Sequence, residues 1–584
     1  MPRHGRPISA IALCLSSIVI IRPPLRLFRL GSLLIIGFLL LSPIRAAEFD
    51  LQNATIADIN AAFDAHALTS EKLTALELKR IETYEPKLHA VITLNPKALD
   101  EARALDAERK AKGPRSPLHG IPVVLKDNYN TTDLQTTGGF YGLKGSLPPA
   151  DATIVAKLRQ AGAIVLAKVN MSEFASGGAM SSLGGQSHNP HNLDYTPAGS
   201  SGGTGVSIAA AYAPLGYGTD TGGSIRGPST ANGVVGLKPT LGLLSRAGII
   251  PLALSFDTGG PIARSVYDIA VSLNVTTGVD PRDDATQKST GKAEKDYTKF
   301  LDKGALKGAR IGLASDFLGV DPEVDVVIES AIGTMRLQGA EIVYFKYPPQ
   351  LLLAKTEIYN AIRRPEFKWQ IQDYLSTLKP GFPKTHADIL ALSEKITAPT
   401  PDGVIPNPTR LASYRQEALC PPLTDPIYLA TKNEGLAFVR ATVLATIADN
   451  KLDAIVYPTS SRRPAKIGAA PEGEGGSGRG RGGSTETVVS YDGPGPHPAL
   501  GSPPAPSVPP GAGGATNIAN LTGFPDLIVP AGFSVDGLPI GISFFGPAFS
   551  EPKLLAYGYA FEQATHALRQ PVNTPSLPGE KFTY

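Results

Sequence analysis

Residues 218–226 read Gly-Thr-Asp-Thr-Gly-Gly-Ser-Ile-Arg, and they are the most informative stretch of the chain. The glycine pair before Ser224 lets the backbone bend so that successive N–H groups converge on one point. The oxyanion that forms at an amide carbonyl needs such a convergence, which makes Ser224 a candidate nucleophile. Glycine-rich turns are more often phosphate cradles or plain turns, but the Gly-Lys-Ser/Thr of a phosphate-binding P-loop does not follow here.

A second glycine-rich turn lies upstream of the first. Residues 199–203 read Gly-Ser-Ser-Gly-Gly, so Ser200 is a second serine in a backbone that can present N–H groups. A Ser-His-Asp triad is the usual alternative for a reactive serine. The chain has no Gly-x-Ser-x-Gly on a strand-to-helix turn with a well-placed histidine downstream. The base must therefore come from another kind of residue.

Lys126 is the candidate base. It ends a short apolar segment over 121–125, which we interpret as a buried strand. A free lysine has a pKa of about 10.4 and is almost wholly protonated at neutral pH. Burial must therefore lower its pKa before it can accept a proton. An ordinary ion pair with Asp127 is the alternative, and these residues alone leave it open.

Strands and helices alternate along the chain, which predicts an α/β layered fold on a buried sheet. The expected elements are helices over 153–160 and 206–211 and strands over 121–125, 163–167, 527–530 and 540–545. The last two strands surround a turn at Asp536-Gly537 and complete the same core. Residues 315–450 are more helical and more polar, and we expect them to form a cap over the site.

The composition changes abruptly over residues 460–514, where Gly, Pro, Ser and Arg dominate. Such a stretch buries too little apolar surface to offset its chain entropy, so we expect a disordered surface insertion. Its arginine-glycine run could also bind RNA. Because it contains only a few arginines, a solvated insertion is the favoured interpretation.

The overall composition argues against several functional classes. With 42% hydrophobic and 18% charged residues over 584 positions, the chain lies far from the disordered class. Its 55 Lys and Arg against 52 Asp and Glu leave a formal charge of +3, too small to indicate a nucleic-acid partner. Cys14 and Cys420 are the two cysteines and the nine histidines are scattered, so we expect no metal site.

Residues 1–46 are predicted to direct export. Two arginines precede an apolar run over 31–41, and Ser-Pro-Ile-Arg-Ala-Ala follows at 42–47, which is the order of a cleavable signal peptide. The apolar runs are shorter than the ~20 residues that span a bilayer. A secreted protein is therefore preferred, and an uncleaved membrane anchor is the alternative. A secretory route is also consistent with glycosylation sequons at Asn53, Asn130, Asn170, Asn274 and Asn520.

In combination, the segments around Lys126, Ser200 and Ser224 resemble the amidase signature family. Their separations are similar to those in the family, with 74 residues from Lys126 to Ser200 and 24 from Ser200 to Ser224. Other similar segments lie at 118–122, 236–240, 257–261 and 520–525. The resemblance covers roughly residues 55–570, and it implies a single α/β/α layered domain on a large mixed, twisted central sheet.

The resemblance also implies roles for individual residues. Ser224 would be the nucleophile, Lys126 the base, and Ser200 the serine that links them, beside an unusual cis peptide bond. The oxyanion hole would consist of the amides of Thr221, Gly222, Gly223 and Ser224. Ala175 and Ser176 match a loop that lines the acyl pocket in relatives. Supporting hydrogen bonds would come from Ser201, Asp220 and Arg226.

The implied activity is hydrolysis of a carboxamide to an acid and ammonia through an acyl-serine, without metal, nucleotide or organic cofactor. Residues 245–251 are similar to the peptide-amidase-like branch, so the expected substrate is a small-molecule or peptide amide. Two alternatives stay open. One is the amidotransferase subunit that works on charged tRNA with a partner subunit, and the other is a catalytically inactive exported binding protein on the same fold.

Overall fold

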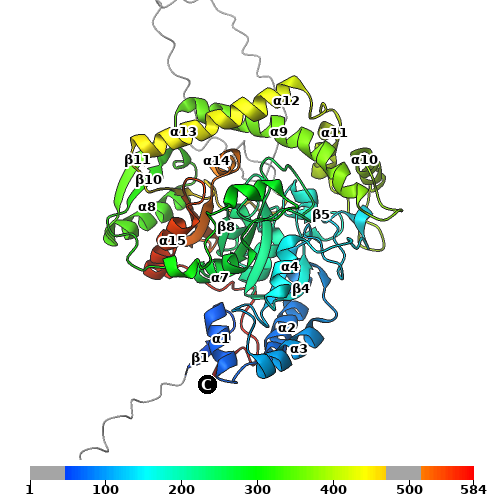
Figure 1. Cartoon of the computed structure of the whole chain (residues 1–584), viewed down its shortest axis with the longest axis vertical. Coiled ribbons are helices and arrows are strands. Elements are labelled where there is room, and N and C mark those ends of the chain that lie inside the picture. The colour runs from blue at the N-terminus through cyan, green and yellow to red at the C-terminus, as the bar shows by residue number, and fades with distance from the viewer. Residues whose placement is uncertain (1–46, 469–513) are drawn as a thin grey trace, which may run out of the picture. The chain divides into compact units, whose positions relative to one another are not determined.

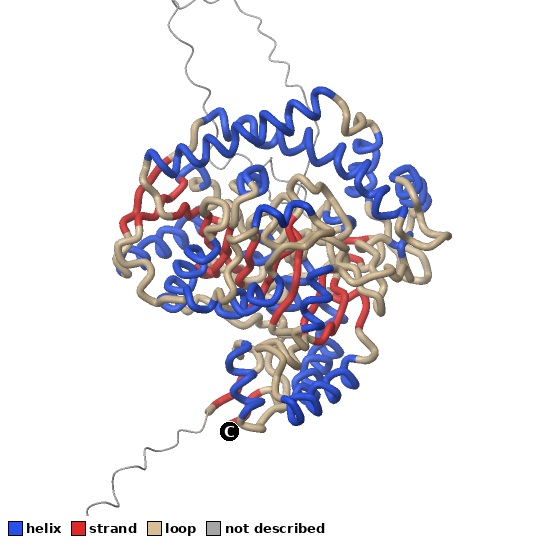
Figure 2. The backbone as a smooth tube through the Cα atoms, viewed as in Figure 1, coloured by secondary structure: helices blue, strands red, loops and turns tan. Residues whose placement is uncertain are grey.

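The computed structural model describes residues 47–468 and 514–584 (Figures 1 and 2). The predicted export segment over 1–46 lies outside the described residues, and so does most of the predicted insertion. Residues from Glu48 to Tyr584 form one unit. Strands β1 (Glu48–Asp50) and β15 (Lys581–Thr583) pair antiparallel, so the unit extends beyond the predicted limits of 55 and 570.

A mixed sheet of eleven strands forms the centre of this unit, as predicted. Several of its strands are buried along their whole length, which explains why their sequences read as continuous apolar runs. In β3 (Pro122–Lys126), Val123 and Leu125 pack on one face and Val124 on the other. The strand order is β11 (Glu341–Phe345), β10 (Arg310–Ala314), β12 (Ala454–Pro458), β14 (Pro539–Phe545), β13 (Asp526–Phe533), β8 (Val235–Lys238), β9 (Thr258–Ala263), β7 (Leu215–Asp220), β3 (Pro122–Lys126), β4 (Ile164–Val169) and β2 (Val91–Leu94).

Helices cover both faces of the sheet and form the predicted α/β/α layers (Figure 2). One face packs against α1 (Ile56–Asp64), α4 (Thr153–Gln160), α7 (Val266–Thr276), α8 (Pro322–Leu337) and α15 (Glu551–Thr565). The other face packs against α2 (Ser70–Leu88), α3 (Ala98–Lys112), α5 (Gly202–Ala209), α6 (Arg226–Ala231) and α14 (Thr516–Thr522). The layers place the ends of β3 and β7 beside the start of α5, where the candidate residues lie.

The predicted elements around the glycine-rich turns are largely confirmed. The helix over 153–160 has the predicted limits, and the strands predicted at 121–125 and 163–167 each begin one residue later and end one or two residues later. The helix predicted over 206–211 instead begins at Gly202, inside the glycine-rich turn. Small residues there allow close packing, because a Cβ atom on Gly203 would lie 2.4 Å from the carbonyl oxygen of Asn170.

The cap predicted over 315–450 is correct only for its second part. Helices α9 (Pro349–Ser376), α10 (His386–Lys395), α11 (Pro408–Ala418), α12 (Pro426–Ala430) and α13 (Leu436–Asp449) form a helical layer, and Figure 1 shows α9 and α13 side by side. The first part belongs to the sheet. Strand β11 pairs in parallel with β10, and α8 connects the two as a crossover helix that buries Val324, Ile328 and Ile332.

The predicted disorder of the insertion is wrong for its first residues. Residues 460–468 are described, and the Arg463 guanidinium forms ion pairs with Asp321, at 2.9 Å, and with Glu323. The backbone of Lys466 forms an isolated antiparallel β-bridge with that of Tyr195. These contacts hold a segment whose composition gave no sign of them, because the partners come from a distant part of the chain.

The fold limits which sequons can carry a glycan. Asn130, Asn170 and Asn520 are buried, so their side chains are inaccessible in the folded chain, whereas Asn53 and Asn274 are exposed.

As to membrane spans, none of the helices found over 47–468 and 514–584 combines the length and apolarity that a crossing requires.

Candidate active site

Lys126 lies at the carboxyl end of β3, and its side chain is completely buried. Its Nζ donates hydrogen bonds to Ser200 Oγ and Thr219 Oγ1, both at 2.7 Å. Burial lowers the pKa of Lys126 to about 7, although the carboxylates of Asp220 and Asp257 oppose this shift. In a large fraction of molecules at neutral pH, Lys126 is therefore a neutral amine that can accept a proton from a hydroxyl.

Asp127 does not pair with Lys126, so the ion-pair alternative is not what the structure shows. The Asp127 carboxylate instead contacts Lys168 Nζ at 3.2 Å and accepts a hydrogen bond from the Thr137 amide at 3.1 Å. Both side chains of this pair are fully buried. The partners of Lys126 Nζ are thus the hydroxyls of Ser200 and Thr219 and, at 3.4 Å, the Thr219 carbonyl, which stabilise its charged form less than a carboxylate would.

Ser200 lies between Lys126 and the Ser224 loop, at the start of α5. The resemblance allowed a cis peptide bond either before or after Ser200. The structure has it before Ser200, between Gly199 and Ser200. The Ser201 amide donates to the Ser224 carbonyl at 3.1 Å, which joins the two serine segments. Among the hydrogen bonds of the described residues, none joins the hydroxyls of Ser200 and Ser224. The structure thus contains the Lys126–Ser200 half of the proposed relay, and the other half stays a prediction.

The loop over 221–224 connects β7 to α6 and carries the predicted oxyanion hole. Gly223 has φ +115°, a conformation that side chains rarely adopt, so glycine is required there. Its amide donates to Asp220 Oδ1 at 2.9 Å and is not free for substrate. The amides of Thr221, Gly222 and Ser224 have no partner within the described part of the chain. Of the four amides predicted to form the hole, Gly223 is therefore excluded by its internal hydrogen bond, and the role of the other three stays a prediction.

Asp220 and Arg226 form a buried ion pair behind this loop, with N and O atoms 3.1 Å apart. Burial would raise the pKa of Asp220, but the Arg226 guanidinium outweighs it and holds that pKa well below its ordinary value. The Asp220 carboxylate also accepts from the Ile225 amide at 2.9 Å, and Arg226 contacts Asp526 at 3.0 Å. The pair therefore fixes the backbone on both sides of Ser224.

Ser201 ties the start of α5 to the end of β7. Its hydroxyl donates to the Thr219 carbonyl at 3.2 Å and accepts from the Thr219 amide at 3.2 Å. Both residues are buried. Because Thr219 also contacts Lys126, this link helps to set the position of the Lys126 amine relative to Ser200.

We expect Asp220→Ala to lower the free energy of unfolding by about 3–5 kcal/mol, because it leaves the buried Arg226 charge with one carboxylate and frees two loop amides. Urea unfolding measures the change. Glu82→Ala is the matched control, because it removes an exposed ion pair with Lys79 and should change little. A loss no larger in Asp220→Ala than in the control would show that the network contributes nothing to stability.

The two residues predicted to line an acyl pocket lie differently. Ala175, with φ +61°, borders a small cavity together with Thr219 and Thr221. Ser176 is not among the residues that line it. Helix α9 covers the other side of the loop, because a Cβ atom on Gly222 would lie 2.5 Å from the Tyr359 hydroxyl. The cap prediction indicated such coverage but not this residue.

Three further residues at the site were not singled out from the sequence. Thr219 was inside the quoted glycine-rich stretch, and its hydroxyl is a direct partner of Lys126. Asp257 was inside a segment that resembles the family, and it accepts from Thr221 Oγ1 at 2.5 Å and from two backbone amides. Asn128, two residues after Lys126, donates to Thr219 Oγ1 at 3.0 Å. Nearness to Lys126 along the chain was the only signal for Asn128.

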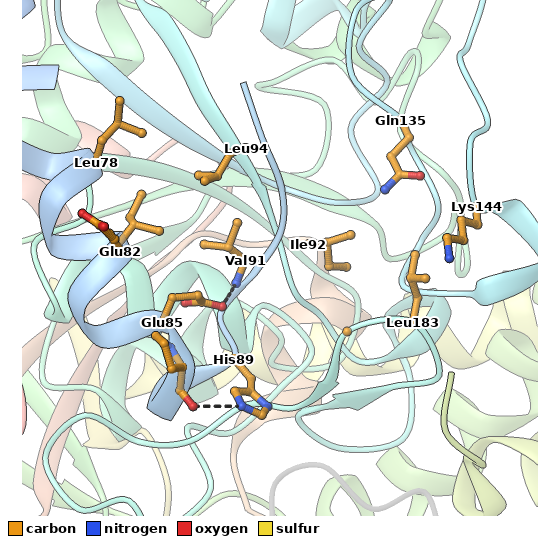
Figure 3. A pocket seen from close by; sticks show the side chains of 13 residues that line it. Leu78, Glu82, Glu85, His89, Val91, Ile92, Leu94, Gln135, Lys144 and Leu183 are labelled. Carbon is orange, nitrogen blue, oxygen red and sulfur yellow. Dashed lines mark hydrogen bonds between the residues drawn. The ribbon is translucent and has the colours of Figure 1, made fainter. Parts of the chain in front are cut away.

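A larger hollow of about 720 Å³ lies between α2 and β2 and contains none of these residues (Figure 3). Apolar side chains such as Leu78, Val91 and Leu94 line it, and the Glu85 carboxylate accepts from the Val91 amide at 2.7 Å. Burial raises the pKa of Glu85 to about 7. The residues that line this hollow include no nucleophile beside a base, so size alone does not identify the reactive site.

Comparison with known proteins agrees with the geometry. The profile of the Amidase family matches residues 72–478. A probable amidase of Arabidopsis thaliana is 33% identical over 551 residues, which cover 90% of this chain and 92% of the relative. A glutamyl-tRNA(Gln) amidotransferase subunit from Alkalilimnicola ehrlichii is 34% identical over 526 residues, which cover 89% of this chain and 99% of that relative.

Solved structures give the same result. The native peptide amidase from Stenotrophomonas maltophilia superposes with a TM-score of 0.75 at 36% identity and covers 89% of this chain and 98% of its own. A peptide amidase in complex with the competitive inhibitor chymostatin has a TM-score of 0.77 at 36% identity, with 89% and 99% covered. Sequence, fold and relatives agree, and the chain belongs to the amidase family.

Proposed function

We propose that this protein hydrolyses carboxamides to carboxylic acids and ammonia through an acyl-Ser224 intermediate. The observation that carries the proposal is the buried Lys126 amine, which lies 2.7 Å from Ser200 Oγ and has a pKa of about 7. A base of this pKa is half neutral near physiological pH, so it can both accept and return a proton. Membership of the amidase family supports the same chemistry.

The reaction begins when Ser224 Oγ attacks the amide carbonyl while Ser200 passes the Ser224 proton to Lys126. The oxyanion that forms would be stabilised by the amides of Thr221, Gly222 and Ser224, which have no partner in the described chain. Lys126 then returns the proton through Ser200 to the nitrogen, which leaves as ammonia. Water next cleaves the acyl-serine ester by the same relay and releases the acid.

Ser200→Ala should lower kcat/KM for a simple amide by about 10²–10⁴-fold, because the relay loses the hydroxyl that both receives and delivers the proton. Steady-state ammonia release measures this loss, and an unchanged melting temperature shows that the variant is folded. Near-normal turnover in Ser200→Ala would rule out a proton path through this residue.

Within amides, we propose linear amides and C-terminal peptide amides as substrates. Support comes from the two peptide amidase structures, which are 36% identical to this chain over most of its length. Ammonia release from matched aliphatic, aromatic and peptide amides tests this. A preference for peptide amides supports the proposal, whereas activity confined to aliphatic or aromatic amides contradicts the peptide part.

An amidotransferase subunit is a second candidate, because curated relatives with that name are 32–34% identical to this chain. That function needs a partner subunit, whereas the proposed hydrolase needs none. The purified chain alone should therefore release ammonia from simple amides. Activity that appears only with a partner and charged tRNA would favour the second candidate.

We further propose that the protein is exported, with 1–46 as the export segment and the exposed Asn53 and Asn274 as the usable sequons.

A further inference from the structure

A cavity of about 10 Å³ lies next to the hydroxyl partner of Lys126. Such a volume holds one water-sized molecule. Thr219, whose Oγ1 lies 2.7 Å from Lys126 Nζ, and Thr221, which carries one of the free loop amides, both line it. The cavity therefore borders the hydroxyl partner of the base and the first residue of the Ser224 loop, whereas Lys126, Ser200 and Ser224 themselves are not among the residues that line it.

The polar side chains around this cavity are all paired, with one exception. Thr221 donates to Asp257, Thr258 donates to the Asp220 carbonyl at 3.2 Å, and Arg246 pairs with Asp283 at 2.6 Å. Asp257 in turn accepts from two backbone amides. The exception is Asn128, whose Oδ1 is buried and has no partner among the residues that the structure describes.

Asn128 is held in a fixed position, so this unpaired oxygen is a built feature of the site. Only 2% of the residue is exposed, and its Nδ2 donates to Thr219 Oγ1 at 3.0 Å. A buried acceptor without a donor costs free energy in the empty protein. The molecule that occupies the cavity must therefore bring an N–H or O–H donor, and a volume of about 10 Å³ admits a group of one heavy atom.

We propose that Asn128 and this cavity form the site for the leaving nitrogen and select an unsubstituted NH2 group. The inference rests on the proposed function. In acylation, Ser224 Oγ bonds to the carbonyl carbon, the C–N bond breaks, and the Ser224 proton, carried by Lys126 through Ser200, goes to the nitrogen. The departing NH3 has one heavy atom and donors for Asn128 Oδ1, and the cavity borders Thr219, the hydroxyl partner of Lys126, from which the proton returns through Ser200.

The experiment compares a primary amide with the N-methylamide of the same acyl group. The wild-type protein should prefer the primary amide by about 10–200-fold in kcat/KM, because one added methyl group has no room in the cavity. Asn128→Ala should lower kcat/KM for the primary amide about tenfold or more and should improve the N-methylamide relative to it, since it removes the acceptor and opens space. Asn128→Leu should weaken the primary amide without improving the N-methylamide, because it removes the acceptor and keeps the volume.

A matched control is Asn95→Ala, which removes a buried asparagine that bonds to the Val165 carbonyl, outside the cavity lining. It should leave the ratio of the two substrates unchanged. Equal losses for both substrates in the Asn128 variants would overturn the inference, because Asn128 would then act only by positioning Thr219 and Lys126. Equal rates for both substrates in the wild type would overturn it without any variant. A wild type that cleaves neither amide would contradict the proposed function itself.

Discussion

Replacing Ser224 with alanine is expected to lower kcat for amide hydrolysis by about six orders of magnitude while the protein still binds its substrate. In serine hydrolases, removal of the nucleophile leaves only the weak catalysis by the oxyanion site and by binding. Here the loop that carries the free amides is fixed by Asp220 and Arg226, whose contacts do not involve the Ser224 hydroxyl. The variant should therefore keep the geometry of the site and lose the chemistry.

The measurement for Ser224→Ala is single-turnover ammonia release together with the dissociation constant of an unreacted amide. Ser229→Ala is the matched control, because Ser229 is a buried serine in α6 whose hydroxyl donates to the Ile225 carbonyl. That control should retain near-normal turnover. Residual activity of Ser224→Ala within tenfold of the wild type would mean that another residue attacks the carbonyl.

Lys126→Ala is expected to reduce amide hydrolysis by orders of magnitude more than hydrolysis of the matched ester. An amine anion is a very poor leaving group, so an amide needs Lys126 both to accept the Ser224 proton and to return it to nitrogen. An alkoxide departs with less help, so the ester depends mainly on the first role. The preference of the wild type for the amide should therefore shrink or invert in the variant.

The pH dependence gives a second readout for Lys126. Burial lowers its pKa to about 7, so the active neutral amine forms as pH rises through that value. Wild-type kcat/KM for the amide should rise with an apparent pKa near 7 and then level off. In Lys126→Ala this step should be absent. Equal losses for amide and ester, or an unchanged pH profile in the variant, would mean that Lys126 has only a structural role.

The same pKa shift makes the stability of the fold depend on pH. Between about pH 7 and 10 the unfolded chain binds a proton at Lys126 that the folded chain does not, so stability rises with pH across this range. The cost of the buried charge is therefore largest below pH 7. Loss of this pH dependence of the unfolding free energy in Lys126→Ala would identify Lys126 as its source.

The sequence predicted the layered fold because it depends on local patterns, whereas the roles of Lys126, Ser200 and Ser224 came from the family resemblance and stay predictions. Apolar runs over 121–125 and 163–167 and the glycine pair before Ser224 are visible without knowledge of distant contacts. The place of Lys126 at the end of an apolar strand indicated that burial could lower its pKa, but an ion pair with Asp127 stayed open. The structure adds the reason why Asp127 does not raise that pKa again, which is its pairing with Lys168.

The sequence failed where long-range contacts decide the outcome. Nothing in the composition of residues 460–468 indicates that Arg463 meets Asp321, and nothing near Gly222 indicates that Tyr359 covers it. The family resemblance assigned the Gly223 amide to the oxyanion hole, but the Asp220 carboxylate already accepts its hydrogen bond. Asn128 was passed over because a buried oxygen without a partner can be recognised only once its surroundings are known.

The most direct test of the account is identification of the residue that becomes acylated. The wild-type protein is treated with a fluorophosphonate that forms a stable adduct with activated serines, and the modified peptide is sequenced by tandem mass spectrometry. We predict a single adduct on Ser224, formed faster as pH rises through about 7, when Lys126 becomes neutral. A protein that turns over amides but carries its adduct on a different residue, or none at all, would contradict the account.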